Sequence, residues 1–205
     1  MPKQTFWNLS QEKRQNIEQA ALNEFAKYGF DNSNINRIVA QGKIAKGSFY
    51  QYFENKKDLY LHLIDTLFAR KLALIEPILN TRPRVSLAHS LEAFFRTGLT
   101  FANSNPKLYL LGVDFSNKPA SFAGDIFQKH DGLGQNIYEE LLEHAQAAGE
   151  LYENADIPLL ASFIHTLITQ TSAQLIRYSS PAEQSHVIAE LISFIERAII
   201  KKEDA

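Results

Sequence analysis

The chain has 205 residues, enough to bury a core without metals or disulfides, and its lack of cysteine excludes thiolate metal sites and cysteine catalysis. Its first residues lack the apolar core of a secretory signal, and no stretch approaches the roughly 18 apolar residues of a membrane helix, so we expect a cytoplasmic protein without a membrane partner. The net charge of −2 divides unevenly: residues 1–57 carry +4 and residues 58–205 carry −6, which indicates that the N-terminal end meets an anion.

Helical periodicity begins close to the N-terminus. From Ser10 onward, apolar residues follow one helical face, and Gly29 stands where such a helix would stop. Ser33 is a candidate N-cap for a second, short helix that ends near Gly42. The first forty residues therefore predict two helices.

Two aromatic residues one turn apart, Phe49 and Phe53, mark a third, short helix with an apolar inner face. Asn55 is a candidate N-cap of a fourth helix, and Asp58 follows three residues later in the arrangement of a capping box. We expect this fourth helix to be long and to stop at Pro77, because proline lacks the amide that a helix interior needs.

The remainder of the chain is also predicted helical, with prolines at or near the breaks. We expect helices near residues 84–104, 107–116, 120–147, 157–178 and 183–201, the third of them irregular around its glycines. No alternating apolar pattern typical of strands competes with these assignments. The predicted fold class is all-α: three short helices, one long connecting helix and a helical bundle, about nine helices in total.

Residues 34–53 contain two short helices joined by a tight turn, which is the geometry of a helix-turn-helix whose second helix enters the DNA major groove. With its two phenylalanines turned inward, that second helix leaves its polar residues facing outward. Lys46 can reach a guanine edge or a phosphate, and Gln51 can pair with adenine. Gly47 lets the backbone approach a groove closely. The pattern predicts a DNA-reading surface.

The sequence IEQAALNEFAKYGFDNSNINRIVAQGKIAKGSFYQYFENKKDLY, residues 17–60, closely resembles the DNA-binding domain of TetR-family transcriptional regulators. The matching elements are AAL..F...G, an isoleucine at position 38 and KGSFYQYF..K..L, at the mutual spacing of the family. The resemblance implies a DNA-binding domain at residues 10–70 and a domain for ligand binding and dimerisation at residues 71–205. It also implies a homodimer without a cofactor, usually a repressor, that binds a double-stranded DNA operator and is released by a small-molecule effector.

The resemblance, carried over by position, assigns nine residues to the DNA interface: Asn34, Asn36, Lys46, Gly47, Ser48, Tyr50, Gln51, Tyr52 and Lys56. Three other positions depart from the family pattern. Lys43 stands where the family has its turn glycine, so either the turn differs or Lys43 adopts a left-handed conformation. Ala45 replaces the serine that usually caps the recognition helix, and Val39 replaces an alanine between the two helices.

The last two predicted helices have apolar faces that fit a two-fold dimer, which would present two recognition helices to half-sites about 34 Å apart on a palindromic operator. The candidate interface residues are Phe163, Leu167, Val187, Ile188, Leu191 and Ile195. The middle helices are rich in aromatic residues, which fit a pocket for an apolar or aromatic effector with a few polar anchors, including His165. The candidate pocket residues are Phe94, Phe101, Tyr109, Phe122, Phe127, Phe163, Thr166 and Gln170. Packing within one chain is the alternative for both sets.

Other interpretations of the sequence were compared with that of a DNA-binding regulator. A carrier or sequestering protein for an apolar small molecule would share the helical body, and steep salt dependence of DNA binding would separate it from a regulator. The six histidines lack the repeated Glu-x-x-His pattern of a di-iron bundle, and the glycines at 124–135 follow no strand, which argues against an enzyme or a metal site. Arg37 is interpreted as a salt-bridge partner in preference to a base reader.

Overall fold

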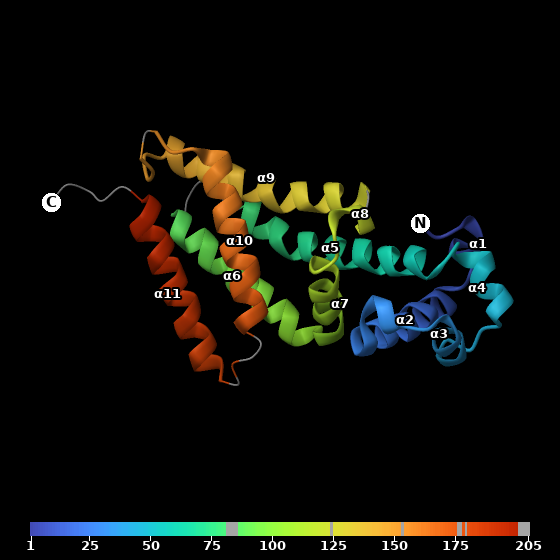
Figure 1. The fold of residues 1–205 in the computed structure, drawn as a ribbon. Helices are drawn as coiled ribbons and strands as arrows, with labels where there is room; N and C mark the ends of the chain where they lie inside the picture. The colour runs from blue at the N-terminus through green and yellow to red at the C-terminus, as the bar shows by residue number, and fades with distance from the viewer. Residues whose placement is uncertain (81–85, 124, 153, 176–177, 179, 201–205) are drawn as a thin grey trace. The chain divides into compact units, whose positions relative to one another are not determined.

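A computed structural model describes residues 1–80, 86–123, 125–152, 154–175, 178 and 180–200 (Figure 1). In these residues the chain forms eleven helices, one isolated antiparallel bridge and no strand. The all-α prediction is confirmed, with two helices beyond the nine expected. The additional ones are α1 (Gln4–Trp7), which the sequence analysis missed, and α8 (Ala120–Ala123), which is separate from α9 (Asp125–Ala147).

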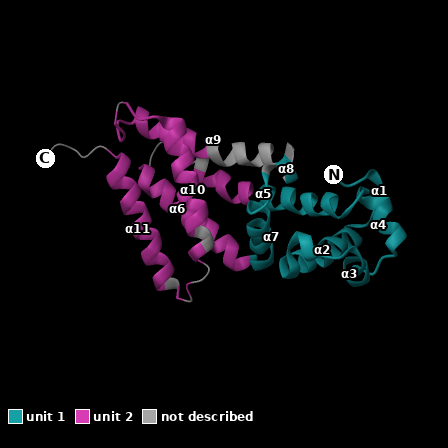
Figure 2. Cartoon of the chain, viewed as in Figure 1, with its two compact units in different colours: residues 1–70, 105–126 teal, residues 71–104, 127–205 magenta. Residues whose placement is uncertain are grey.

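Contacts divide the chain into two compact units, coloured separately in Figure 2. Unit 1 consists of residues 1–70 and 105–126, and unit 2 consists of residues 71–104 and 127–205. The sequence analysis assigned residues 105–126 to the C-terminal domain. These residues belong to unit 1 because α7 (Pro106–Ser116) packs against α2 (Gln11–Asn32).

Side-chain caps define where the helices of unit 1 begin. The Ser10 hydroxyl oxygen accepts a hydrogen bond from an amide in the first turn of α2. Asn34, and not Ser33 as predicted, caps α3 (Ile35–Gln41), while the Ser33 hydroxyl donates to the carbonyl of Phe30. Asn55 accepts from the amide of Asp58 at the start of α5 (Lys56–Asn80), as predicted, whereas the Asp58 carboxylate accepts from the Glu54 amide and not from that of Asn55.

Unit 1 has a core of aromatic and aliphatic side chains from α1, α2, α3, α4 (Lys46–Tyr52) and the first half of α5. The largest fully buried members are Tyr60, Phe6, Phe25, Phe49, Phe53, Ile17, Ile38, Leu59, Ile64 and Leu67. Because Phe49 of α4 and Phe53, which directly follows the helix, are both completely buried, apolar packing holds the inner face of α4 on the other helices.

Unit 2 is built from α6 (Leu87–Ser104), α9, α10 (Ile157–Leu175), α11 (Pro181–Ile199) and the last part of α5. Helix α6 packs against both α10 and α11, and these two also contact each other. The buried cluster that results is almost entirely apolar, and it includes Leu91, Phe94, Phe95, Leu142, Ala161, Ile164, Ile188 and Ile195.

Pro77 does not end α5, contrary to the prediction. The helix continues to Asn80 although proline removes one backbone hydrogen bond and crowds the preceding turn. Ile75 and Ile78, on either side of Pro77, pack against the apolar cluster of unit 2. Burial of these two side chains offsets the free-energy cost of placing proline inside the helix. The presence of proline alone therefore predicted the wrong helix boundary.

Candidate nucleic-acid interface

The turn between α3 and α4 closes tightly at Gly42 and Lys43. Gly42 is buried, and a Cβ atom there would lie 3.2 Å from the carbonyl oxygen of Ile38. Lys43 has a φ of +52°, so the left-handed conformation, one of the two alternatives left open above, is the one adopted. The Ile44 amide donates to the carbonyl of Val39 across the turn, 3.0 Å away. The turn thereby fixes where α4 starts relative to α3.

Helix α4 presents a polar outer face. Lys46, Gly47, Tyr50 and Gln51 are exposed, whereas Ser48 and Tyr52 are half-buried. Its N-cap, Ala45, provides no side-chain hydrogen bond, as expected from the loss of serine. In the preceding helix, Asn36 is exposed in the first turn, and the Asn34 side chain accepts from its amide at 2.8 Å.

A Cβ atom at Gly47 would meet nothing within 4 Å. The fold itself therefore places no steric demand for glycine at this position. Glycine in a helix normally lowers stability by about 0.5–1 kcal/mol relative to alanine. A glycine that the fold does not require, on an exposed recognition-helix face, is typical of a surface to which a partner comes close.

A buried carboxylate fixes the corner between α2 and α3. Glu24 is 1% exposed, and its Oε1 accepts from the Asn34 amide at 2.8 Å and from Arg37 Nε at 2.8 Å. The hydrogen bond to Glu24 raises the pKa of the Arg37 guanidinium, which also lies over the ring of Tyr28. The interpretation of Arg37 as a salt-bridge partner is confirmed.

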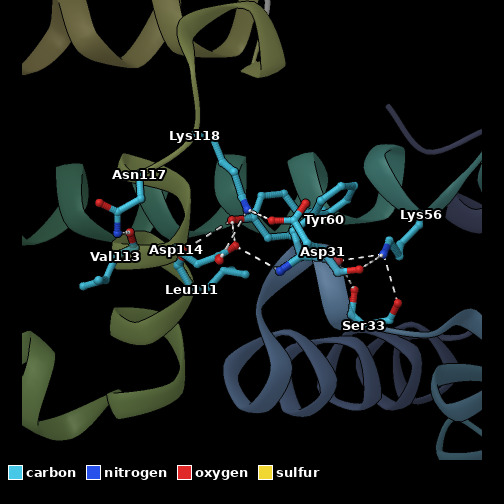
Figure 3. A network of polar contacts seen from close by, with 10 residues as sticks. Asp31, Ser33, Lys56, Tyr60, Leu111, Val113, Asp114, Asn117 and Lys118 are labelled. Carbon is cyan, nitrogen blue, oxygen red and sulfur yellow. Dashed lines mark hydrogen bonds and ion pairs between the residues drawn. The ribbon is translucent and has the colours of Figure 1, made fainter.

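Lys56, the first residue of α5, extends its side chain to the C-terminal end of α2. Figure 3 shows its ammonium group directed at the backbone of this segment, where it donates to the carbonyls of Phe30 at 2.6 Å, Ser33 at 2.9 Å and Asp31 at 3.4 Å. Burial lowers the pKa of Lys56, and the charges of Asp31 and Glu24 oppose that change. Lys56 therefore has a structural role that the sequence did not indicate, and its contact with DNA phosphate stays a prediction.

Asp114 joins α7 to the end of α2 and to α5. Its Oδ2 accepts from the Phe30 amide at 3.1 Å and from the Tyr60 hydroxyl at 2.7 Å, and its Oδ1 lies 3.6 Å from Lys118 Nζ (Figure 3). Burial raises the pKa of the Tyr60 hydroxyl, and the bond to Asp114 raises it further, so the hydroxyl stays protonated and donates. Gly29, with a φ of +67°, makes room for this carboxylate.

A second link between the same segments is the ion pair of Lys118 and Asp31. Their Nζ and Oδ2 atoms are 2.5 Å apart. The hydrogen bond from Lys118 lowers the pKa of the Asp31 carboxyl. Burial alone would lower the pKa of Lys118, but its bonds and charge interactions with Asp31 and Asp114 outweigh burial and raise it. Neither partner was identified from the sequence, because 87 residues separate them in the chain.

Comparison with known proteins identifies the family. Residues 17–63 match the family described as bacterial regulatory proteins, tetR family. The chain is 30% identical over 158 residues to the transcriptional regulator AcuR of Cereibacter sphaeroides, covering 72% of this chain and 68% of AcuR. The chain belongs to the TetR family. It is a DNA-binding transcriptional regulator and not an enzyme.

Two further proteins illustrate the similarity. A TetR family transcriptional regulator from Chloroflexus aurantiacus has a crystal structure that matches with a TM-score of 0.71 at 28% identity, covering 98% of this chain and all of that one. The negative transcriptional regulator IcaR of the biofilm operon icaADBC in Staphylococcus aureus is 25% identical over 122 residues, which cover 59% of this chain and 63% of IcaR. The similarity to the crystal structure extends far beyond the helix-turn-helix.

The pocket residues predicted from the sequence of this TetR-family protein are divided between unit 1 and unit 2. Phe94 and Phe101 are buried in unit 2, whereas Phe122 packs against Phe30 in unit 1, where Tyr109 also lies half-buried. Three other predicted pocket residues lie on an exposed face of α10: Phe163, Thr166 and Gln170. The side chain of Phe127 lies outside the described part of the chain.

The dimer residues predicted from the sequence divide into two groups. Ile188 and Ile195 are 1% and 2% exposed in the single chain, so the core of unit 2 already covers them and they have no area left for a partner. Val187 and Leu191 are partly buried against that core. Phe163 and Leu167 remain exposed on α10, and the sequence analysis overlooked two further exposed apolar residues, Leu159 and Phe194.

A cavity of about 260 Å³ lies where the start of α10 meets the end of α11. Its lining includes Leu159, Leu160, Ala198 and Ile199, and none of the predicted pocket residues. In the part of the chain that the structure describes, no helix is long and apolar enough to cross a membrane, and no group of three or more acidic, histidine or cysteine side chains could hold a metal.

Proposed function

We propose that this TetR-family protein is a cytoplasmic repressor that binds a palindromic double-stranded DNA operator as a homodimer and is released by a small apolar or aromatic effector. The observation that carries the proposal is the polar outer face of α4, held in position by two fully buried phenylalanines behind it. Repression is the mode stated in the name of the relative IcaR, a negative transcriptional regulator.

The proposed DNA contacts come from three elements. Lys46, Ser48 and Gln51 read base edges or phosphates, and Gly47 lets the backbone of α4 come close to the groove. The other proposed contacts are Asn34, the N-cap of α3, Asn36 in α3, Tyr50 and Tyr52 in α4, and Lys56 at the start of α5. The ammonium of Lys56 is shared with carbonyls at the end of α2, so phosphate would have to compete with those carbonyls for its protons.

The proposed dimer interface is the exposed apolar face of α10 and α11. Phe163 and Phe194 are each 55% exposed, and Leu159 and Leu167 are 47% and 37% exposed. Large apolar side chains gathered on adjoining helices lower the free energy when a second copy covers them. Val187 and Leu191 extend this face, whereas Ile188 and Ile195 support it from inside.

The proposed effector region is an aromatic group in the core of unit 2. The ring of Tyr138 lies 6.0 Å from that of Phe94 and 5.8 Å from that of His165. Burial raises the pKa of the Tyr138 hydroxyl, so the group offers a neutral donor among apolar rings. Such surroundings suit a flat apolar molecule with one or two polar atoms.

The proposed coupling follows the chain from this region to the DNA-reading helices. Phe94 is on α6, and α6 is joined by a single residue to α7, which carries Asp114. Because Asp114 binds the Phe30 amide just before α3, a shift of α7 would disturb the corner that positions α3 and α4. An effector that binds better to the shifted state would lower operator affinity. The long helix α5 offers a second route, since it continues from Lys56 into unit 2.

The test is DNA binding at two salt concentrations. A duplex enriched from a random-sequence pool with the unaltered protein, here called the selected duplex, is compared with a scrambled duplex of equal length. We expect specific binding that weakens steeply with salt, and Lys46→Met should reduce the slope of log K against log salt by about 1. Lys107→Met, on α7, is the matched control that should leave the slope unchanged. Absence of salt-dependent binding to any DNA would favour the carrier.

A further inference from the structure

The N-terminal segment, residues 3–6, lies against the C-terminal end of the recognition helix α4. Three consecutive carbonyls of α4 accept hydrogen bonds from this segment. The amide of Lys3 donates to the carbonyl of Tyr52 at 2.8 Å, and the Lys3 ammonium group donates to the carbonyl of Tyr50 at 2.9 Å. The Thr5 hydroxyl donates to the carbonyl of Gln51. This segment lies outside residues 17–63, which match the family.

These bonds meet a need that α4 cannot meet itself. The last four carbonyls of any α-helix have no partner within the helix. Helix α4 has only seven residues, and isolated helices of that length are unstable in water. Its N-cap Ala45 supplies no side-chain bond, and Phe53 at its other end leaves in an extended conformation. The Phe53 amide binds only the carbonyl of Phe49, and the segment of residues 3–6 supplies donors for the three carbonyls that follow it at the C-terminal end of α4.

Phe6 anchors the segment in the core of unit 1. Its side chain is completely buried, and its ring lies 4.9 Å from that of Phe53, 6.3 Å from that of Tyr52 and 5.5 Å from that of His62. His62 is itself buried and lies 2.8 Å from Glu18 of α2. The segment is therefore attached to α5 at Phe6 and to α4 through Lys3 and Thr5.

We infer that residues 3–6 form a clamp that positions α4 for sequence-specific DNA binding, with Lys3, Thr5 and Phe6 as positioning residues. The clamp keeps the last turn of α4 from fraying, so that Gln51 and Tyr52 are presented in one conformation. Because α4 is already ordered in the free protein, DNA binding does not have to supply the conformational entropy lost on ordering it, and specific complexes are tighter. The inference rests on the proposed function for its effect on DNA, but the effect on α4 itself can be measured without DNA.

The experiment uses Thr5→Val in the full chain, because valine keeps the shape of threonine and removes only the donor. Thr100→Val is the matched control, since the Thr100 hydroxyl also donates to a carbonyl, that of Arg96, within α6 of unit 2. Hydrogen exchange of the amides of Gln51, Tyr52 and Phe53 is followed by NMR. We expect about three- to tenfold faster exchange in Thr5→Val and no change in Thr100→Val.

DNA binding supplies the second readout. Affinity of Thr5→Val for the selected duplex should fall about three- to tenfold, while affinity for the scrambled duplex and both salt slopes stay the same, because no charge is removed. A merely structural role would lower the melting temperature without changing this specificity ratio. Unchanged exchange in α4 would overturn the clamp whether or not DNA binds, and an unchanged ratio would overturn its role in recognition. If no duplex is enriched at all, the proposed function fails while the exchange result still decides the clamp.

Discussion

Unit 1 and unit 2 are stabilised in different ways. In unit 1, side chains from different helices bind one another or distant backbone groups: Glu24 with Arg37, Lys56 with the end of α2, and Asp114 with Phe30 and Tyr60. In the described part of unit 2, the buried cluster is almost entirely apolar. Its described hydrogen bonds include some within one helix, such as those from Thr100 and Thr166 to carbonyls one turn earlier. Others join separate segments, from Gln184 to the carbonyls of Leu175 and Tyr178 and from the Leu87 amide to Glu150.

The difference follows from what each unit has to do. Directional hydrogen bonds hold helices in one geometry, which a DNA-reading surface requires. Apolar packing depends on volume and shape, and it tolerates exchange of one apolar side chain for another. The polar links thus fix the geometry of the DNA-binding unit, whereas apolar packing leaves unit 2 more tolerant of apolar substitutions. Substitutions in each unit test this contrast.

The largest effect is expected on the exposed apolar face of unit 2. Phe163→Glu would place two unpaired carboxylates in a two-fold interface, at a cost of about 4 kcal/mol, or roughly a thousandfold in the dimer dissociation constant. Sedimentation at several concentrations measures that constant. Leu110→Glu is the matched control, because Leu110 is 48% exposed but belongs to unit 1. Equal dimerisation of both variants would contradict the assignment of this face.

The next effect compares two glycines with positive φ, one in each unit. Gly29→Ala should lower the free energy of unfolding by about 3 kcal/mol, because its φ of +67° and ψ of 175° suit only glycine and a Cβ would lie 2.8 Å from Asp114 Oδ1. Gly149→Ala in unit 2 should lower it by only about 1 kcal/mol, since its φ is +77° but a Cβ there would meet nothing within 4 Å. Urea denaturation measures both, and equal losses would show that Asp114 does not restrict Gly29.

Removal of the Asp114 carboxylate should have a somewhat smaller effect. Asp114→Ala removes the acceptor of the Phe30 amide and the nearer of two acceptors of the Tyr60 hydroxyl, which should lower the free energy of unfolding by about 2 kcal/mol. Tyr60→Phe removes only one of these bonds and should cost about 1 kcal/mol. If Tyr60→Phe costs as much as Asp114→Ala, the bond to the Phe30 amide contributes nothing.

The smallest effect concerns the exposed ion pair of Asp31 and Lys118 and depends on pH. Because the pKa of Asp31 is lowered in the folded state, its contribution is present above its unfolded value near 3.9 and is lost as pH falls through the folded value. Because the pKa of Lys118 is raised, that contribution persists below about 10.4 and is lost as pH rises through the folded value.

Asp31→Asn should therefore be slightly less stable than the unaltered protein at neutral pH, and the two should converge at acidic pH. Added salt should reduce the difference, since the Asp31 side chain is 74% exposed. Thermal unfolding between pH 3 and pH 7 measures it. A difference that grows as the pH falls would contradict the sign of the Asp31 shift.

Local features of this fold were predictable from the sequence because their causes lie within a few residues. Examples are the cap of α5 by Asn55, the inward phenylalanines of α4 and the left-handed alternative at Lys43. Pro77 was wrongly predicted to stop a helix, because burial of its neighbours against unit 2 is a tertiary effect.

The polar links of unit 1 were not predictable in the same way. Asp114 looks like any acidic residue on a helix, and its partners Phe30 and Tyr60 lie 84 and 54 residues away. The segment of residues 3–6 has no helical periodicity of its own, and its bonds to α4 depend on the folded core around Phe6. Likewise, the apolar periodicity of α11 could not distinguish Ile188, turned to the core, from Phe194, turned outward.

We propose that the outer face of α4 approaches DNA closely, and substitution of Gly47 is the direct test. Gly47→Ala is compared with Gly98→Ala in α6, because a Cβ at either position would meet nothing within 4 Å in the free protein. Both substitutions should raise the free energy of unfolding by about 0.5–1 kcal/mol. Fluorescence anisotropy with the selected duplex should then show that Gly47→Ala binds at least about tenfold more weakly, a loss of about 1.4 kcal/mol, while Gly98→Ala binds normally. Unchanged affinity of Gly47→Ala would contradict the close approach of α4 to the groove.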